Sequence, residues 1–167
     1  MTYHFHYLTN EIRNLMVEEL EKDLADESYY LSKNFNSVGD EKCFEIAKTE
    51  MLNGDEDTFA HSLTDNNCFD AKNKEGRTVP KNASELYAHN EFNRFYMRAI
   101  ARKAITDSKD LIVYRAKESS SPRPESEDLL GKIISPVKLL EDLRNDYFIE
   151  KAFGLAKPNS GLSVTFN

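Results

Sequence analysis

The chain has 167 residues, of which 40% are hydrophobic and 31% charged, and its formal net charge is −7 at pH 7. A chain of this length can bury its own core as one domain without a disulfide or a metal. Its two cysteines, Cys43 and Cys68, have no Cys or His neighbours at ligand spacing, which argues against a disulfide framework and a structural zinc site.

Targeting signals are absent from the sequence pattern. The N-terminus lacks the basic start and apolar run of a signal peptide, and no stretch approaches the roughly 20 consecutive apolar residues of a membrane span. We therefore expect one domain over residues 1–167 in the cytoplasm, with no membrane segment, metal or cofactor.

Charge is unevenly distributed along the chain. Residues 1–70 carry five Lys and Arg against sixteen Asp and Glu, residues 71–123 carry twelve against six, and residues 124–167 carry five against seven. Such segregation is a clue to partners. It permits either two faces that meet different partners or two parts of the chain that attract each other on folding.

The first elements are a strand and a helix. Segment 3–7, YHFHY, alternates aromatic and histidine side chains, the pattern of a half-buried strand. Thr9 or Asn10 then caps a helix that runs to about Asp26. The helix has one apolar stripe and one acidic face. The acidic face consists of Glu11, Glu18, Glu19, Glu21 and Asp23.

Two further helices are predicted at 40–53 and 55–63. The first ends at Asn53–Gly54, and the second begins with an acidic cluster at Asp55 that suits a helix N-terminus. Residues 64–81 are polar and contain glycine and proline, so we expect a loop there.

The stretch 82–106 is predicted to be the central helix, because it contains neither Gly nor Pro and is rich in good helix formers. Its apolar sector spans more than half the circumference, which indicates a helix surrounded by other elements. The narrow polar sector holds Glu91, Arg94, Arg98 and Arg102.

The remaining elements follow in order. Residues 111–117 have the β-branched and aromatic content of a strand, and 118–134 is rich in Ser and Pro and is expected to be a loop. A helix begins at Ser135–Pro136, one or two further helical turns are expected at 147–155, and a strand closes the chain at 162–166. The fold class is therefore α+β, mainly helical, with a small sheet from 3–7, 111–117 and 162–166.

The first functional hypothesis concerns the arginines of the central helix. Their spacing of four residues aligns them along one edge, where they suit the phosphates of a polyanion. We interpret the chain as a binding or adaptor protein that contacts nucleic acid or another polyanion through this face. The proposed contacts are Arg94, Arg98, Arg102, Arg115, Lys117 and Arg123. Alternatively, the arginines pair with the protein's own acidic residues, Glu91 and the acidic face of the first helix among them.

The second hypothesis is a small enzyme. His89 and Asn93 lie one turn apart in the apolar sector, with Glu85 one turn earlier. In this hypothesis His89 is the general acid–base, Glu85 orients it, Asn93 fixes a substrate and an arginine holds an anionic group. Alternatively, the three residues form a hydrogen-bonded core network.

A third hypothesis is a protein–protein assembly module. Tyr29, Tyr30 and Phe35 form an aromatic cluster without clear periodicity, which could present a partner-binding surface. The sequence specifies no oligomeric state.

Overall fold

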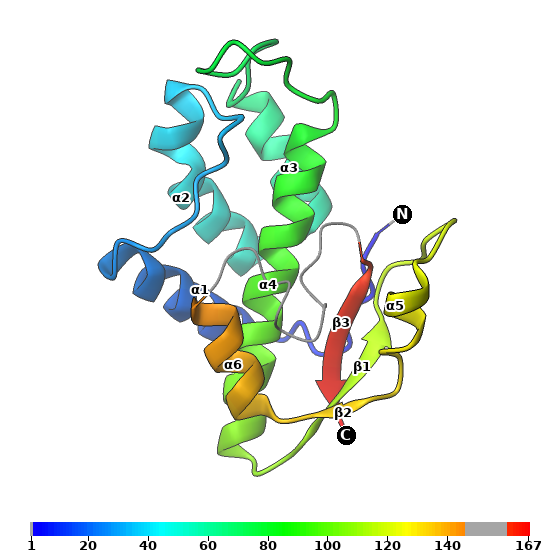
Figure 1. The fold of residues 1–167 in the computed structure, drawn as a ribbon. Coiled ribbons are helices and arrows are strands. Elements are labelled where there is room, and N and C mark those ends of the chain that lie inside the picture. The colour runs from blue at the N-terminus through cyan, green and yellow to red at the C-terminus, as the bar shows by residue number, and fades with distance from the viewer. Residues whose placement is uncertain (1, 146–159) are drawn as a thin grey trace.

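The longest helix, α4 (Ala83–Thr106), runs through the middle of the molecule, where the sequence predicts a central helix. The computed structural model describes residues 2–145 and 160–167. The fold is α+β, as predicted, with helices around α4 and a small antiparallel sheet. Figure 1 shows the sheet on one side of α4, and α1 and α2 on the other.

Three helices precede α4 in the chain, and the side chains that cap them explain where they begin. Thr9 accepts a hydrogen bond from the Ile12 amide, Asn36 accepts one from Gly39, and Asp55 forms a reciprocal capping box with Thr58. The helices are α1 (Asn10–Ala25), α2 (Ser37–Asn53) and α3 (Glu56–Asp65). The three predicted helices are therefore confirmed, although α2 begins earlier than expected.

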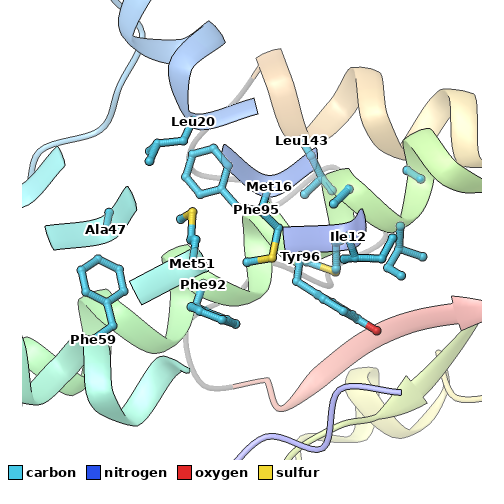
Figure 2. Close-up of a cluster of buried hydrophobic side chains, with 14 of the residues drawn as sticks. Ile12, Met16, Leu20, Ala47, Met51, Phe59, Phe92, Phe95, Tyr96 and Leu143 are labelled. Atoms are coloured by element: carbon cyan, nitrogen blue, oxygen red, sulfur yellow. The ribbon is translucent and has the colours of Figure 1, made fainter. Parts of the chain in front are cut away.

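The hydrophobic core lies where these helices meet α4. Figure 2 shows Phe92, Phe95 and Tyr96 of α4 among side chains from α1, α2 and α3, all of them buried. The labelled partners from the other helices are Ile12, Met16, Leu20, Ala47, Met51, Phe59 and Leu143. Because α4 is covered on several sides, its apolar sector is wider than the stripe of a surface helix.

The sheet has the order β2-β1-β3, and both pairings are antiparallel. Its strands are β1 (Leu111–Arg115), β2 (Ile133–Ile134) and β3 (Leu162–Phe166). The predicted strands at 111–117 and 162–166 are confirmed, and they pair in register with Val113 opposite Val164. Two more helices, α5 (Pro124–Glu127) and α6 (Pro136–Asn145), come from the chain between β1 and β3.

The predicted strand at 3–7 is wrong. The Tyr3 amide donates to the side chain of Glu56 over 2.5 Å rather than to a neighbouring strand. The His4 amide does reach a carbonyl beyond the end of β1, that of Ala116, but a single bond does not make a ladder. The third strand of the sheet is β2, which lies in the stretch 118–134 that we expected to be a loop.

Two other expectations concern the loop before α4 and the segment that follows α6. Residues 66–82, between α3 and α4, form a loop with a short bridge between Lys72 and Thr78. The helical turns expected at 147–155 lie outside the described residues. Within the described part of the chain, no helix is long and apolar enough to cross a membrane.

Candidate functional site

Arg94 and Arg98 do not face solvent, so the interpretation that they form an exposed anion-binding edge is wrong. They are 6% and 0% exposed. Arg98 forms ion pairs with Asp23 at 2.8 Å and Glu19 at 2.7 Å, and Arg94 pairs with Glu91 at 3.1 Å and Asp23 at 3.4 Å. The alternative, pairing with the protein's own acidic residues, Glu91 and the acidic face of the first helix among them, is what the structure shows.

The ion network extends to a third helix. Glu19 also accepts hydrogen bonds from Arg144 of α6 at 2.6 and 2.9 Å. Burial alone raises the pKa of Glu19, but the hydrogen bonds from Arg144 and Arg98 lower it below its ordinary value, so the carboxylate is charged. Arg102, farther along α4, is partly exposed and pairs with Glu18 at 2.7 Å. These contacts join α1, α4 and α6.

The other proposed polyanion contacts are separated from this edge. Arg115 pairs with Glu127 of α5, Lys117 lies against His89, and the exposed Arg123 lies at the N-cap of α5. The strand that contains Arg115, β1, and the helix that Arg123 precedes, α5, lie on the sheet side of α4 in Figure 1, and Lys117 follows β1 in the chain. The six cations therefore do not form one continuous surface.

His89 is held between two charged side chains. Its Nε2 is 2.8 Å from Asp57 Oδ1, and its Nδ1 is 2.8 Å from Lys117 Nζ. Because an ammonium group only donates, Nδ1 must accept and Nε2 must carry the proton that is donated to Asp57. Burial lowers the pKa of His89 and the positive Lys117 lowers it further, against the opposing effect of Asp57. His89 is therefore neutral with both ring nitrogens engaged.

The catalytic arrangement expected around His89 is not assembled in this form. Glu85 is exposed, and Asp57 of α3 accepts from the imidazole in its place. Asn93 is buried and donates to the Leu162 carbonyl at 2.8 Å, so it ties α4 to β3. The alternative, one core network of these three residues, is not formed either: His89 binds Asp57 and Lys117, and Asn93 donates only to the backbone while its buried Oδ1 has no hydrogen-bond partner among the described residues.

The aromatic cluster of the third hypothesis is mainly internal. Phe35 is fully buried, with its ring 4.7 Å from that of Tyr87. Tyr30 is half-buried and stacks on Tyr87, whose hydroxyl donates to the Tyr30 carbonyl. The half-buried Tyr29 lies 3.2 Å from the Cys43 sulfur. These side chains attach the connection between α1 and α2 to the core, so Phe35 cannot line a partner-binding surface.

A groove opens between α1, the C-terminal end of α4, and α6, which lie close together in Figure 1. It consists of two adjoining hollows of about 420 and 330 Å³ that share Ile105, Leu140 and Arg144. Val137 lines the larger hollow and Leu15 the smaller. Ile105 and Val137 are 40% and 59% exposed. We call these hollows together the α1/α4/α6 groove.

The sequence reasoning missed this groove, although two signals mark it. Ile105 follows Arg98 by seven residues, so it lies within about 20° of the arginine edge instead of in the apolar sector. Val137 precedes Leu139 by two residues, about 200° around α6, and therefore falls outside the stripe that Leu139 and Leu143 bury. Apolar residues on a polar helix edge indicate either a neighbouring element or a binding surface.

Comparison of the chain with protein-family models, curated proteins and solved structures found no match. Among the residues that the structure describes, no three His, Cys, Asp or Glu side chains are grouped as a metal site requires. The function of the protein is therefore inferred from the geometry of the α1/α4/α6 groove and from the contacts of His89 with Asp57 and Lys117.

Proposed function

We propose that this protein is a cytoplasmic protein-binding module that holds an apolar segment of a partner in the α1/α4/α6 groove. The observation that carries the proposal is that Ile105 and Val137, both exposed, line the same concavity. Single exposed apolar residues are normal on a protein surface, but two that line one hollow resemble the apolar centre of an interface. The unpaired Cys43 and Cys68 support the cytoplasmic location.

The walls of the groove suit this role because they are held in place before a partner arrives. Glu19 of α1 binds both Arg98 of α4 and Arg144 of α6. A surface that is ordered in advance loses less conformational entropy on binding. The charged residues at its edges add specificity more than affinity.

Polyanion binding and catalysis have less support from the geometry. Arg94 and Arg98 are buried in ion pairs, so they cannot reach phosphates without leaving carboxylates unpaired in the core. His89 has both nitrogens engaged and no arginine among its described contacts.

Site-specific photo-crosslinking tests the groove. Benzoylphenylalanine replaces Val137, and the protein is irradiated in an extract of the cells that produce it. We expect a discrete covalent adduct, because a bound partner lies against this side chain. The matched control has the same probe at Ile133, which is 60% exposed but lies on β2 outside the groove.

A second substitution connects the adduct to the groove. Ile105→Asp places a charge where the two hollows meet and should reduce adduct formation at position 137 about tenfold or more, since burying an unpaired charge is costly. Equal adduct yields at positions 133 and 137, or an adduct unaffected by Ile105→Asp, would overturn the proposal.

A further inference from the structure

Residues 2–7, which we call the strap, contact α3, α4 and the sheet without forming a helix or a strand themselves. The strap is held by hydrogen bonds to segments that are far away in sequence. Thr2 donates to Asp57 at 2.8 Å, and the amides of Tyr3, His4 and Tyr7 donate to Glu56, the Ala116 carbonyl and the Tyr96 hydroxyl at 2.5, 2.7 and 3.2 Å. These are single contacts on separate elements, so releasing the strap breaks neither a helix nor a sheet ladder.

The strap covers His89. The Tyr3 ring is 6% exposed and meets the imidazole edge-on, with ring centroids 6.0 Å apart. The Lys117 ammonium lies over the same tyrosine ring, 5.6 Å from its centroid. Phe5 packs on Tyr96 of α4, with centroids 4.5 Å apart. His89 is itself only 6% exposed, so removing the strap would expose its imidazole to solvent.

The attachment of the strap at Glu56 is a weak point, because this carboxyl group is fully buried and only partly satisfied. Its Oε1 accepts from the Tyr3 amide, whereas its Oε2 has no hydrogen-bond partner among the described residues. Burial raises the pKa of Glu56, and the neighbouring Asp57 and Asp55 raise it further. A neutral carboxyl group can remain in such a place, but burying a carboxylate there is costly.

We infer that the strap is a pH-sensitive gate: ionisation of Glu56 releases residues 2–7 from α3 and uncovers His89. In the released state the carboxylate is hydrated and titrates at its ordinary value. Closure is therefore strongest below about pH 4.3 and weakens as pH rises toward the raised pKa. The opening constant grows about tenfold for each unit by which the pKa is raised and then levels off. This gate does not depend on the α1/α4/α6 groove.

Five titratable groups surround Glu56 or its partners. They are Asp55 and Asp57 at the start of α3, Tyr3 in the strap, His89 in α4 and Lys117 after β1. Burial alone raises the pKa of Asp57, but hydrogen bonds from Thr2 and His89 lower it, and burial lowers the pKa of His89. Acid therefore weakens the strap at both groups, the opposite of its effect at Glu56. Burial raises the pKa of Tyr3, so its hydroxyl stays protonated near neutral pH.

Amide hydrogen exchange measured by NMR tests the gate. The opening constants of the Tyr3, His4 and Tyr7 amides are compared with that of Ala47, a core residue of α2, in the wild-type protein. We expect the strap amides to open at least about 100-fold more readily than Ala47, because they exchange by local release. Strap amides with the same opening constant as Ala47 would mean that only global unfolding releases them, which overturns the inference.

Glu56→Gln identifies the group responsible, since it keeps an acceptor for the Tyr3 amide but does not ionise. The ratio of wild-type to Glu56→Gln exchange rates, taken at each pH between about 4 and 7.5, cancels the contributions of Asp57 and His89. We expect this ratio to rise with pH at the strap amides, about tenfold for each unit of raised pKa. The matched control is Glu41→Gln, exposed on α2, whose ratio should stay constant. A ratio for Glu56→Gln that does not change with pH overturns the inference.

Reaction with diethyl pyrocarbonate tests whether the strap uncovers His89. The modification of His89 is measured by mass spectrometry relative to that of the exposed His61 in the same sample. At about pH 7.5 we expect His89 to react more slowly in Glu56→Gln than in the wild-type protein, by the same factor as the strap amides exchange. Equal reactivity of His89 in the two proteins would show that Glu56 does not control access to it.

Discussion

Arg98 donates hydrogen bonds to Asp23 from both terminal nitrogens, each 2.8 Å from a different carboxylate oxygen, and the pair is buried between α4 and α1. The third nitrogen of the guanidinium, Nε, donates to Glu19 at 2.8 Å. Each of the three guanidinium nitrogens therefore donates to a carboxylate inside the protein. This explains how a charged residue with no exposed surface is compatible with a stable core.

Removing this arginine should be far more damaging than removing its exposed neighbour. Arg98→Met leaves Glu19 and Asp23 short of a counter-charge in the core, and we expect a loss of about 3–5 kcal/mol in the free energy of unfolding. Arg102→Met, on the same helix but partly exposed, should cost no more than about 1 kcal/mol. Urea denaturation of both variants provides the comparison. Equal losses would show that the buried pairs contribute no more than surface ones.

His89 should make stability depend on pH. Its pKa is lowered in the folded protein by burial and by Lys117, so the unfolded chain takes up a proton first as pH falls. This contribution to stability is complete above about pH 6.5, the ordinary value for histidine, and is lost as pH falls toward the lowered pKa. His89→Gln should remove the part of the acid-induced loss of stability that His89 causes. For each unit by which the pKa of His89 is lowered, the free energy of unfolding falls by about 1.4 kcal/mol between pH 7.5 and a pH below the lowered pKa.

The control for this experiment is His61→Gln, because His61 is exposed on α3. Free energies of unfolding at several values between pH 7.5 and 5 should keep the wild-type slope in this variant. A His89→Gln variant with the same slope as the wild-type protein would contradict the prediction.

Glu56 should have the opposite pH dependence. Burial raises the pKa of this carboxyl group, against the hydrogen bond from the Tyr3 amide, and its contribution to stability is lost as pH rises through the raised pKa. Glu56→Gln keeps an acceptor for Tyr3 but carries no charge. We expect it to be more stable than the wild-type protein at pH 7, by about 1.4 kcal/mol for each unit of the shift, with the gain shrinking toward pH 4. Exposed Glu41→Gln should show no such pH-dependent gain.

Gly39 is required for close packing rather than for backbone freedom. A Cβ at this position would lie 2.6 Å from the Cys68 carbonyl oxygen and 2.7 Å from the Phe35 ring. Gly39→Ala should therefore cost about 1–3 kcal/mol, although alanine favours a helix by about 1 kcal/mol. Glu41→Ala, on the exposed side of α2, is the control and should be neutral or slightly stabilising. A stabilised Gly39→Ala variant in thermal unfolding would show that the neighbours can move aside.

Local sequence signals predicted the elements well where local chemistry determines them. α4, β1 and β3 were found from helix formers, β-branched residues and the absence of Gly and Pro, all properties of a single segment. The same reasoning failed at 3–7, because the acceptors for Tyr3 and Tyr7 are side chains of Glu56 and Tyr96, far away in sequence. The two-residue strand β2 has no sequence signature at all, since only its pairing with β1 defines it.

For the site residues, too, local spacing was predicted correctly and contacts between distant segments were not. Spacing correctly placed Arg94, Arg98 and Arg102 on one edge, but exposure depends on which helix covers that edge, and no local pattern states this. The net charges of the segments permitted both alternatives, and the structure shows that the acidic face of α1 supplies counter-ions to the arginines. For His89, proximity in sequence favoured Glu85, whereas the fold brings Asp57 to the ring.

The buried pairing of Glu19 and Asp23 with Arg98 also constrains how this sequence can vary over generations. Replacing Arg98 alone destabilises the protein, and so does replacing either Glu19 or Asp23 alone. Tolerated variants therefore alter these positions together, even though Asp23 and Arg98 are 75 positions apart. Correlated substitution at 19, 23 and 98 is the record that this enclosed charge cluster should leave among descendants of the chain.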